Sequence, residues 1–260
     1  MKVALFFYII IIFILLSASI NIIKALHNIM VKTFEEFINE AAIYPQKFDM
    51  DIFKSLRSYS KKEKYCNDNL QRIASGSSRV VYKIDDNTVL KLAKNKKGLS
   101  QNEAEASMED DYFASGLNLF AKVYDRDENY NWIESQLARK AKPTDFKRIT
   151  GYDWKTFQNF VGYVASKYIP KRIFCVTFWD ESYEELFKSE EFQNNMWEDY
   201  DSLFYTVNEY LMNYQIEGFG DIQRISSWGV IQNEDGEEKL ILIDYGLNND
   251  TLNNHYKKLK

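Results

Sequence analysis

Cysteine and histidine are nearly absent from this 260-residue chain, which has two of each. Cys66 and Cys175 are too few for a disulfide framework or for a zinc site made of four cysteines. His27 and His255 lie near the two ends of the chain, outside any motif. Ser-His-Asp and Cys-His mechanisms need a histidine base, and the sequence offers no candidate for that role.

An excess of positive charge is also lacking. The formal net charge is -5 and the isoelectric point is near 5.3, which argues against broad attraction to a phosphate backbone. Basic clusters at residues 61–64 and 94–97 are interrupted by polar residues or followed by acidic ones, as is typical of a solvated face. We therefore expect no nucleic-acid partner. A hydrophobic content of 45% supplies enough apolar side chain for a sizeable core.

The N-terminus carries an almost unbroken apolar run, residues 3–23, of about the length that spans a bilayer. As a secretory signal it has Lys2 before it and small residues at 17–19. As a signal anchor it is followed by Lys24 and Lys32, which favours a cytoplasmic location for the following domain. A membrane partner is expected only if this run is a genuine anchor.

A third interpretation places the biological start at Met30, so that residues 1–29 would not belong to the protein. Residues 30–37 resemble the opening of a soluble protein, because Thr33 and Glu36 have the spacing of a helix capping box. Residues 30–69 would then form an N-terminal helical extension. All three interpretations remain open at this point.

Short strand-like runs rich in β-branched residues mark the next part of the chain. The pattern predicts five strands, at residues 70–74, 79–84, 89–92, 120–124 and 132–137. Helical spacing predicts one helix between the third and fourth strands, at residues 100–114, with Gly116 just past its end. Ser100 and Glu103 have capping-box spacing, and Glu105 lies on the stripe that such a helix buries.

Two features of these strands are compatible with phosphate chemistry, although the loop alone is better explained as a serine-rich hairpin and a lone strand lysine usually faces solvent; the spacing of the lysine behind the loop favours the phosphate interpretation. The first two strands are joined by a loop of small residues, Gly76, Ser77 and Ser78, which leads to Val81. Small residues let a backbone approach phosphate groups closely. Lys91 follows within the third strand, where alternation can turn one lysine toward a cleft.

The second half is helical in pattern from residue 144 to residue 218, and its aromatic residues are most simply core packing. Asp221 then opens a loop, and residues 230–232 and 239–243 form a hairpin that ends in Asp244-Tyr245-Gly246. Asp221 and Asp244 therefore flank the hairpin, and strand ends of this kind can bring two carboxylates to one cleft.

This order of loop, lysine, helix, aspartate, hairpin and Asp-aromatic-Gly resembles the protein-kinase-like superfamily, over residues 73–247. The resemblance implies an α+β, two-lobe fold. Residues 70–138 would form a small five-stranded antiparallel lobe with one helix, and residues 139–260 a mainly helical lobe with the catalytic loop. ATP and Mg²⁺ are the implied cofactors.

The resemblance also implies roles for individual residues. Lys91 and the loop of Gly76, Ser77, Ser78 and Val81 would contact ATP, and Glu105 would pair with Lys91, with Glu103 as the alternative. Glu134 to Leu137 would form the hinge beside adenine. Asp221 would be catalytic together with Lys91, Asp244 would hold Mg²⁺, and Ser226 would be a second metal ligand.

The sequence departs from the family pattern in three places. Only the middle glycine of the loop is kept, Ser226 stands where the family has asparagine, and no His-Arg pair precedes Asp221. Fourteen residues follow Gly246, too few for the segments on which peptide substrates dock. This argues against a conventional Ser/Thr or Tyr kinase. The long helical section is closer in proportion to aminoglycoside-phosphotransferase-like relatives.

Within the superfamily, the segments around Gly76, Gln101-Asn102 and Asp244 resemble kinase-like proteins encoded by tailed bacteriophages, which favours Met30 as the start. Two functions follow: an atypical phosphotransferase with an unknown protein or small-molecule acceptor, or a pseudokinase that senses nucleotide or binds protein. A membrane-anchored structural protein requires the motif order to be coincidental. Because ATP is scarce outside cells, we expect a cytoplasmic location, with anchoring through residues 3–23 as an option.

Overall fold

The computed structural model describes residues 45, 47–168, 179–198, 202–215, 219–233 and 235–255. The chain divides into two compact units, Met1–Ala42 and Ile43–Lys260, and all described residues belong to the second unit. The predictions for residues 3–23 and 30–37 therefore lie outside the described residues. Within these ranges, no helix combines the length and the apolar character needed to cross a bilayer.

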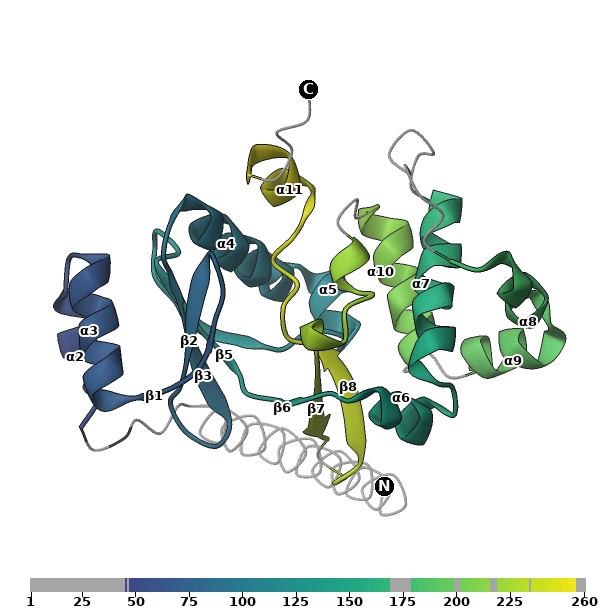
Figure 1. Cartoon of the computed structure of the whole chain (residues 1–260), viewed down its shortest axis with the longest axis horizontal. Helices are drawn as coiled ribbons and strands as arrows, with labels where there is room; N and C mark the ends of the chain where they lie inside the picture. The colour runs from purple at the N-terminus through teal and green to yellow at the C-terminus, as the bar shows by residue number, and fades with distance from the viewer. Residues whose placement is uncertain are drawn as a thin grey trace, which may run out of the picture. The chain divides into compact units, whose positions relative to one another are not determined.

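The fold is α+β (Figure 1). It contains the predicted five-stranded antiparallel sheet, in the order β1-β2-β3-β5-β4. All six residues of β3 are buried, as expected for the central strand. The five strands are β1 (Gln71–Ser75), β2 (Arg79–Lys83), β3 (Thr88–Ala93), β4 (Val123–Arg126) and β5 (Trp132–Gln136). The fourth strand starts later than predicted, because Phe120 instead bridges to Leu242 of a second sheet.

The helix after β3 begins earlier than the sequence analysis predicts. Helix α4 spans Lys96–Asp110, and the side chain of Asn95 caps it by accepting from the backbone N–H groups of Lys97 and Gly98. The expected capping box at Ser100 and Glu103 is therefore wrong. Ser100 lies in the second turn, and Glu103 is exposed. The side chain of Asn95 accepts from the unpaired backbone N–H groups of the first turn, and it therefore fixes the start of α4 ahead of Ser100.

The same helix also ends earlier than predicted. Asp111 accepts from the N–H groups of Phe113 and Ala114 and caps a separate short helix, α5 (Tyr112–Gly116). Gly116 is the last residue of α5 rather than a cap on the long helix. The C-terminal helix α11 (Asn249–His255) packs on α4, where the Ser100 and Thr251 hydroxyls lie 2.8 Å apart.

Two short helices precede the sheet within the predicted N-terminal extension: α2 (Met50–Ser55) and α3 (Tyr59–Asn69). The ring of Phe53 meets that of Trp132 in β5 edge-on, with 5.8 Å between centroids. Tyr82 in β2 donates its hydroxyl to Asn67 at 2.9 Å. These contacts join both helices to the sheet.

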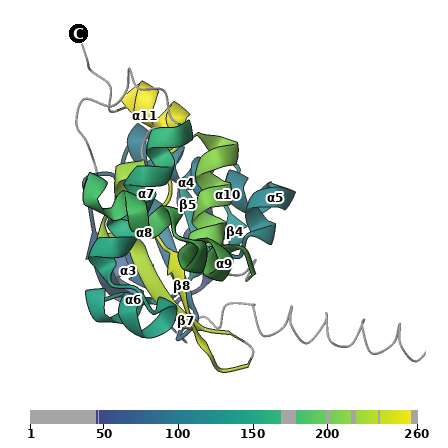
Figure 2. The same cartoon turned by 90° about the vertical axis from the view of Figure 1, so that its right-hand side faces the viewer.

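The predicted helical section is confirmed where it is described. It contains α6 (Pro143–Thr150), α7 (Trp154–Tyr168), α8 (Glu184–Lys188), α9 (Glu190–Glu198) and α10 (Leu203–Tyr214). Helices α7 and α10 run side by side (Figure 2). Phe157 and Phe160 of α7 are buried and each contacts the ring of Phe204 in α10, so aromatic residues form core packing here, as expected.

The predicted hairpin of the second half is also present, with β7 (Trp228–Gln232) paired to β8 (Glu238–Leu242) and β6 (Arg139–Lys140) added at its edge. Two single-turn 3₁₀ helices, Phe219–Asp221 and Ile225–Ser227, lead into β7. The chain leaves β8 directly into Asp244, which places this residue at the end of a buried strand.

Candidate active site

Lys91 and Glu105, predicted to pair, lie together in the interior. Lys91 Nζ lies 2.6 Å from Glu105 Oε2, and both side chains are almost completely buried. Lys91 also donates to the carbonyl oxygen of Ile243 at 2.9 Å. Lys91 therefore connects the central strand, helix α4 and the segment that carries Asp244.

An arginine that the sequence analysis gave no role completes this cluster. Arg79, the first residue of β2, lies with Nη2 2.8 Å from Glu105 Oε1 and 2.7 Å from Asp244 Oδ1. Its Nη1 donates to Asn102 Oδ1 at 3.2 Å. In the sequence, Arg79 takes the place of the last glycine of the kinase-like loop pattern, so the available signal was a large charged residue where that pattern has no side chain.

The charges of this cluster set its protonation. Burial by itself raises the pKa of Glu105, but the positive charges of Arg79 and Lys91 outweigh burial and lower that pKa. Burial lowers the pKa of Lys91, Glu105 opposes this effect, and Arg79 adds to it. For Arg79, the charges of Glu105 and Asp244 outweigh burial and raise the pKa. Glu105 and Arg79 are therefore held as an ion pair.

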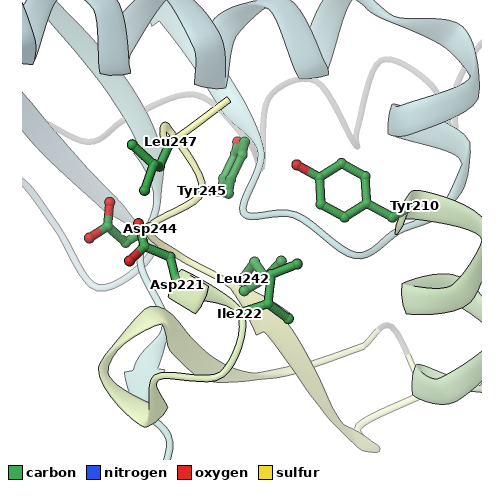
Figure 3. A pocket seen from close by; sticks show the side chains of 7 residues that line it. All are labelled: Tyr210, Asp221, Ile222, Leu242, Asp244, Tyr245 and Leu247. Atoms are coloured by element: carbon green, nitrogen blue, oxygen red, sulfur yellow. The ribbon is translucent and has the colours of Figure 1, made fainter. Parts of the chain in front are cut away.

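Asp221 and Asp244, the two predicted carboxylates, line one small pocket of about 240 Å³, a volume that includes the open space at its mouth. Figure 3 shows both carboxylates on the same side of this pocket, with Tyr210 opposite. Ile222, Leu242 and Leu247 supply apolar walls. The structure thus brings Asp221 and Asp244 to a common space rather than to opposite faces.

The two carboxylates differ in their surroundings. The Asp221 side chain is 20% exposed and the Asp244 side chain 54%. Burial raises the pKa of Asp221, an effect that Arg224 opposes and the charge of Asp244 reinforces. Arg224 Nη1 lies 2.9 Å from Asp221 Oδ1. A carboxylate with a raised pKa accepts a proton more readily than an ordinary aspartate, which suits a general base.

The loop between β1 and β2 is a tight turn, in which Gly76 N–H donates to the carbonyl of Arg79 at 2.9 Å. The side chain of Ser78 donates to Gln101 Oε1 at 2.5 Å, and the carbonyl of Ser77 accepts from Asn95. The predicted loop residues are thus tied to the start of α4. Val81 lies directly opposite Lys91 in the sheet.

The expected hinge residues lie at the end of β5. The side chain of Glu134 is buried within this strand, where the residue pairs with Leu90. The N–H of Leu137 donates to the carbonyl of Asn87 at 2.6 Å. A backbone group that is to hold adenine must be available to the ligand, and in this arrangement the Leu137 N–H already has an acceptor.

Ser226, the expected second metal ligand, is exposed, and the pocket lining in the described part of the chain does not include it. Among the described residues, no group of three or more His, Cys, Asp and Glu side chains is placed to hold a metal ion. Asp244 alone would fit an Mg²⁺ ion brought by a nucleotide, because Mg²⁺ commonly takes one or two carboxylates and completes its shell with phosphates and water.

Close packing fixes the segment around Asp244. A Cβ at Gly246 would lie 2.7 Å from the carbonyl oxygen of Gln101 in α4, so only glycine fits there. Tyr245 is buried, and its hydroxyl donates to the carbonyl of Ala121 at 2.6 Å. These contacts hold Asp244 between α4 and the pocket.

Comparison with other proteins finds no protein-family model that matches the chain and no curated protein that matches it.

Proposed function

We propose that residues 70–246 form a protein-kinase-like domain that binds ATP and transfers its γ-phosphate to an acceptor. The observation that carries the proposal is one connected arrangement: the buried Lys91–Glu105 pair touches the segment of Asp244, and Asp244 shares a pocket with Asp221. A chance collection of charged residues would not put a strand lysine, a helix glutamate and two loop carboxylates together in this order.

Each side chain has a task in this proposal. Lys91, oriented by Glu105, contacts the nucleotide phosphates, and the β1–β2 loop with Gly76 covers them. Asp244 would hold Mg²⁺, which would neutralise charge on the transferring phosphate. Asp221 orients the acceptor hydroxyl and takes its proton, a role that its raised pKa supports. The acceptor is a protein or a small molecule.

Specific observations favour a second candidate, a pseudokinase that binds nucleotide or protein without turnover. Arg79 already contacts Asp244, and the Leu137 N–H at the expected hinge already has an acceptor. Both features compete with a bound metal–nucleotide complex. In this alternative, the Lys91–Glu105 pair is retained as part of the core.

An assay for release of the γ-phosphate from labelled ATP distinguishes the phosphotransferase from the pseudokinase. The purified full chain is incubated with Mg²⁺ and ATP, and release of phosphate to water or to the chain itself is measured for the wild type and Asp244→Asn. A phosphotransferase shows turnover that Asp244→Asn abolishes. ATP binding without transfer to water or to the chain, in both proteins, favours the pseudokinase.

A further inference from the structure

Arg79 is a buried arginine at the position where the loop pattern of the proposed family has a glycine. Its side chain is 8% exposed, and its guanidinium meets partners from two separate segments: Glu105 and Asn102 on α4, and Asp244 after β8. The proposed mechanism does not use it.

The charges around Arg79 balance without a metal ion. Two anions, Glu105 and Asp244, face two cations, Arg79 and Lys91. Arg79 holds one oxygen of Asp244 at 2.7 Å, a typical length for a charge-assisted hydrogen bond. A guanidinium stays protonated throughout the range in which proteins are folded, so pH does not remove this partner.

Asn102 keeps the guanidinium in place. Its side-chain oxygen accepts from Arg79 Nη1 at 3.2 Å, while its amide nitrogen donates to the carbonyl of Tyr130 at 2.9 Å. Asn102 is itself completely buried. Arg79 is therefore oriented from one side by α4, and Asp244 meets a preformed cation.

We propose that Arg79 is a resident counter-ion of Asp244, which occupies the cation position at this carboxylate and suppresses the binding of a free divalent metal ion there. A metal ion then enters with the phosphates of a nucleotide, which supply the additional ligands and negative charge. The inference builds on the proposed function, because there Asp244 is the metal-binding carboxylate. Arg79 is a positioning residue in this scheme, not a catalytic one.

Binding of Mn²⁺ alone to the full chain tests the inference without any nucleotide. Removal of a positive charge a few ångströms from the metal position favours the metal, so Arg79→Met binds Mn²⁺ at least about tenfold more tightly than the wild type. Asp244→Asn in the Arg79→Met background removes this gain. Equal affinity of Arg79→Met and the wild type overturns the inference.

Two further variants make the result specific. Arg72→Met removes an arginine from an exposed position of β1 and controls for the loss of one positive charge, so its Mn²⁺ affinity equals that of the wild type. Asp244→Asn alone keeps Arg79 and covers the case in which Arg79→Met does not fold. The inference predicts equally weak Mn²⁺ binding for the wild type and Asp244→Asn, and a wild type that loses tight binding in Asp244→Asn contradicts it.

A titration of the same proteins with ATP and Mg²⁺ tests the proposed function independently of the counter-ion role of Arg79. If Arg79→Met gains Mn²⁺ affinity but no protein binds ATP, the counter-ion role stands and the phosphotransferase fails. If the wild type binds Mg²⁺-ATP while Arg79→Met gains no Mn²⁺ affinity, the nucleotide site of the proposed function stands and the counter-ion role is wrong.

Discussion

Lys91 Nζ and Glu105 Oε2 lie 2.6 Å apart in the interior, and they connect the central strand to the only long helix packed on it among the described residues. Among the described residues, Glu105 is the one fully buried carboxylate that contacts both Arg79 and Lys91. The pair therefore has a structural task, the docking of α4, as well as the nucleotide-binding task that we propose.

Glu105→Gln tests the structural task. The substitution leaves two buried cations without their shared carboxylate, and we expect a loss of about 3–5 kcal/mol in the free energy of unfolding. Denaturant unfolding measures the loss. Glu103→Gln is the matched control, because Glu103 is exposed on the same helix and its replacement changes stability by less than about 0.5 kcal/mol. Equal effects of the two substitutions would contradict the assignment.

Gly246→Ala tests the contact between the Asp244 segment and α4. The new Cβ would meet the carbonyl oxygen of Gln101 at 2.7 Å, and we expect a destabilisation of about 1–3 kcal/mol. Gly76→Ala is the control, since nothing lies within 4 Å of a Cβ there, and its effect is expected to be below about 0.5 kcal/mol. Thermal unfolding of both variants gives the comparison.

Asp221→Asn tests how much the ionised, partly buried carboxylate of Asp221 lowers the free energy of unfolding. The pKa of Asp221 in the folded protein is raised above the ordinary value of 3.8, so the ionised carboxylate destabilises the fold at pH values above its folded pKa, and protonation relieves this cost as the pH falls. Asp221→Asn is therefore more stable than the wild type at about pH 7, and the difference shrinks toward about pH 4. An advantage that grows with acidity would show that the pKa is lowered instead.

The same variant separates the roles of the two carboxylates if the domain is active. Asp221→Asn lowers kcat and leaves the KM for ATP largely unchanged, because Asp221 acts on the acceptor. Asp244→Asn abolishes Mg²⁺-supported turnover. Steady-state kinetics with varied ATP measures kcat and the KM for ATP separately. A large rise in the KM for ATP of Asp221→Asn would assign that residue to nucleotide binding.

The sequence predicted the parts of the site that depend on local periodicity. Strand alternation indicated Lys91, helical spacing chose Glu105 over Glu103, and the hairpin indicated the position of Asp244 at a strand end. The helix start was wrong because the side chain of Asn95 caps the backbone one turn before Ser100. Asn95 and Ser100 are both residue types that cap helices, and the helical spacing of the following residues does not decide which of the two begins the helix.

The role of Arg79 could not be predicted from local pattern. Its partners Asn102 and Asp244 are 23 and 165 positions away in the chain, and only the folded arrangement brings them together. In the sequence, position 79 was interpreted only as a missing loop glycine, and the positive charge of Arg79 was given no role. The hydrogen bond from Leu137 to Asn87 is likewise a contact between two backbone groups, for which side-chain identity carries no signal.

Calorimetric titration of the full chain with ATP in the presence of Mg²⁺ tests the central claim most directly, with Lys91→Met as the test variant. Glu105 keeps Arg79 as a partner in this variant, so we expect the variant to fold, and its unfolding curve checks this. Lys83→Met is the control, because Lys83 pairs with Asp86 at the far end of β2. We predict that the wild type and Lys83→Met bind ATP and that Lys91→Met binds at least about tenfold more weakly, through loss of a phosphate contact. A wild-type chain that does not bind ATP, or a folded Lys91→Met that binds it equally well, would contradict the account.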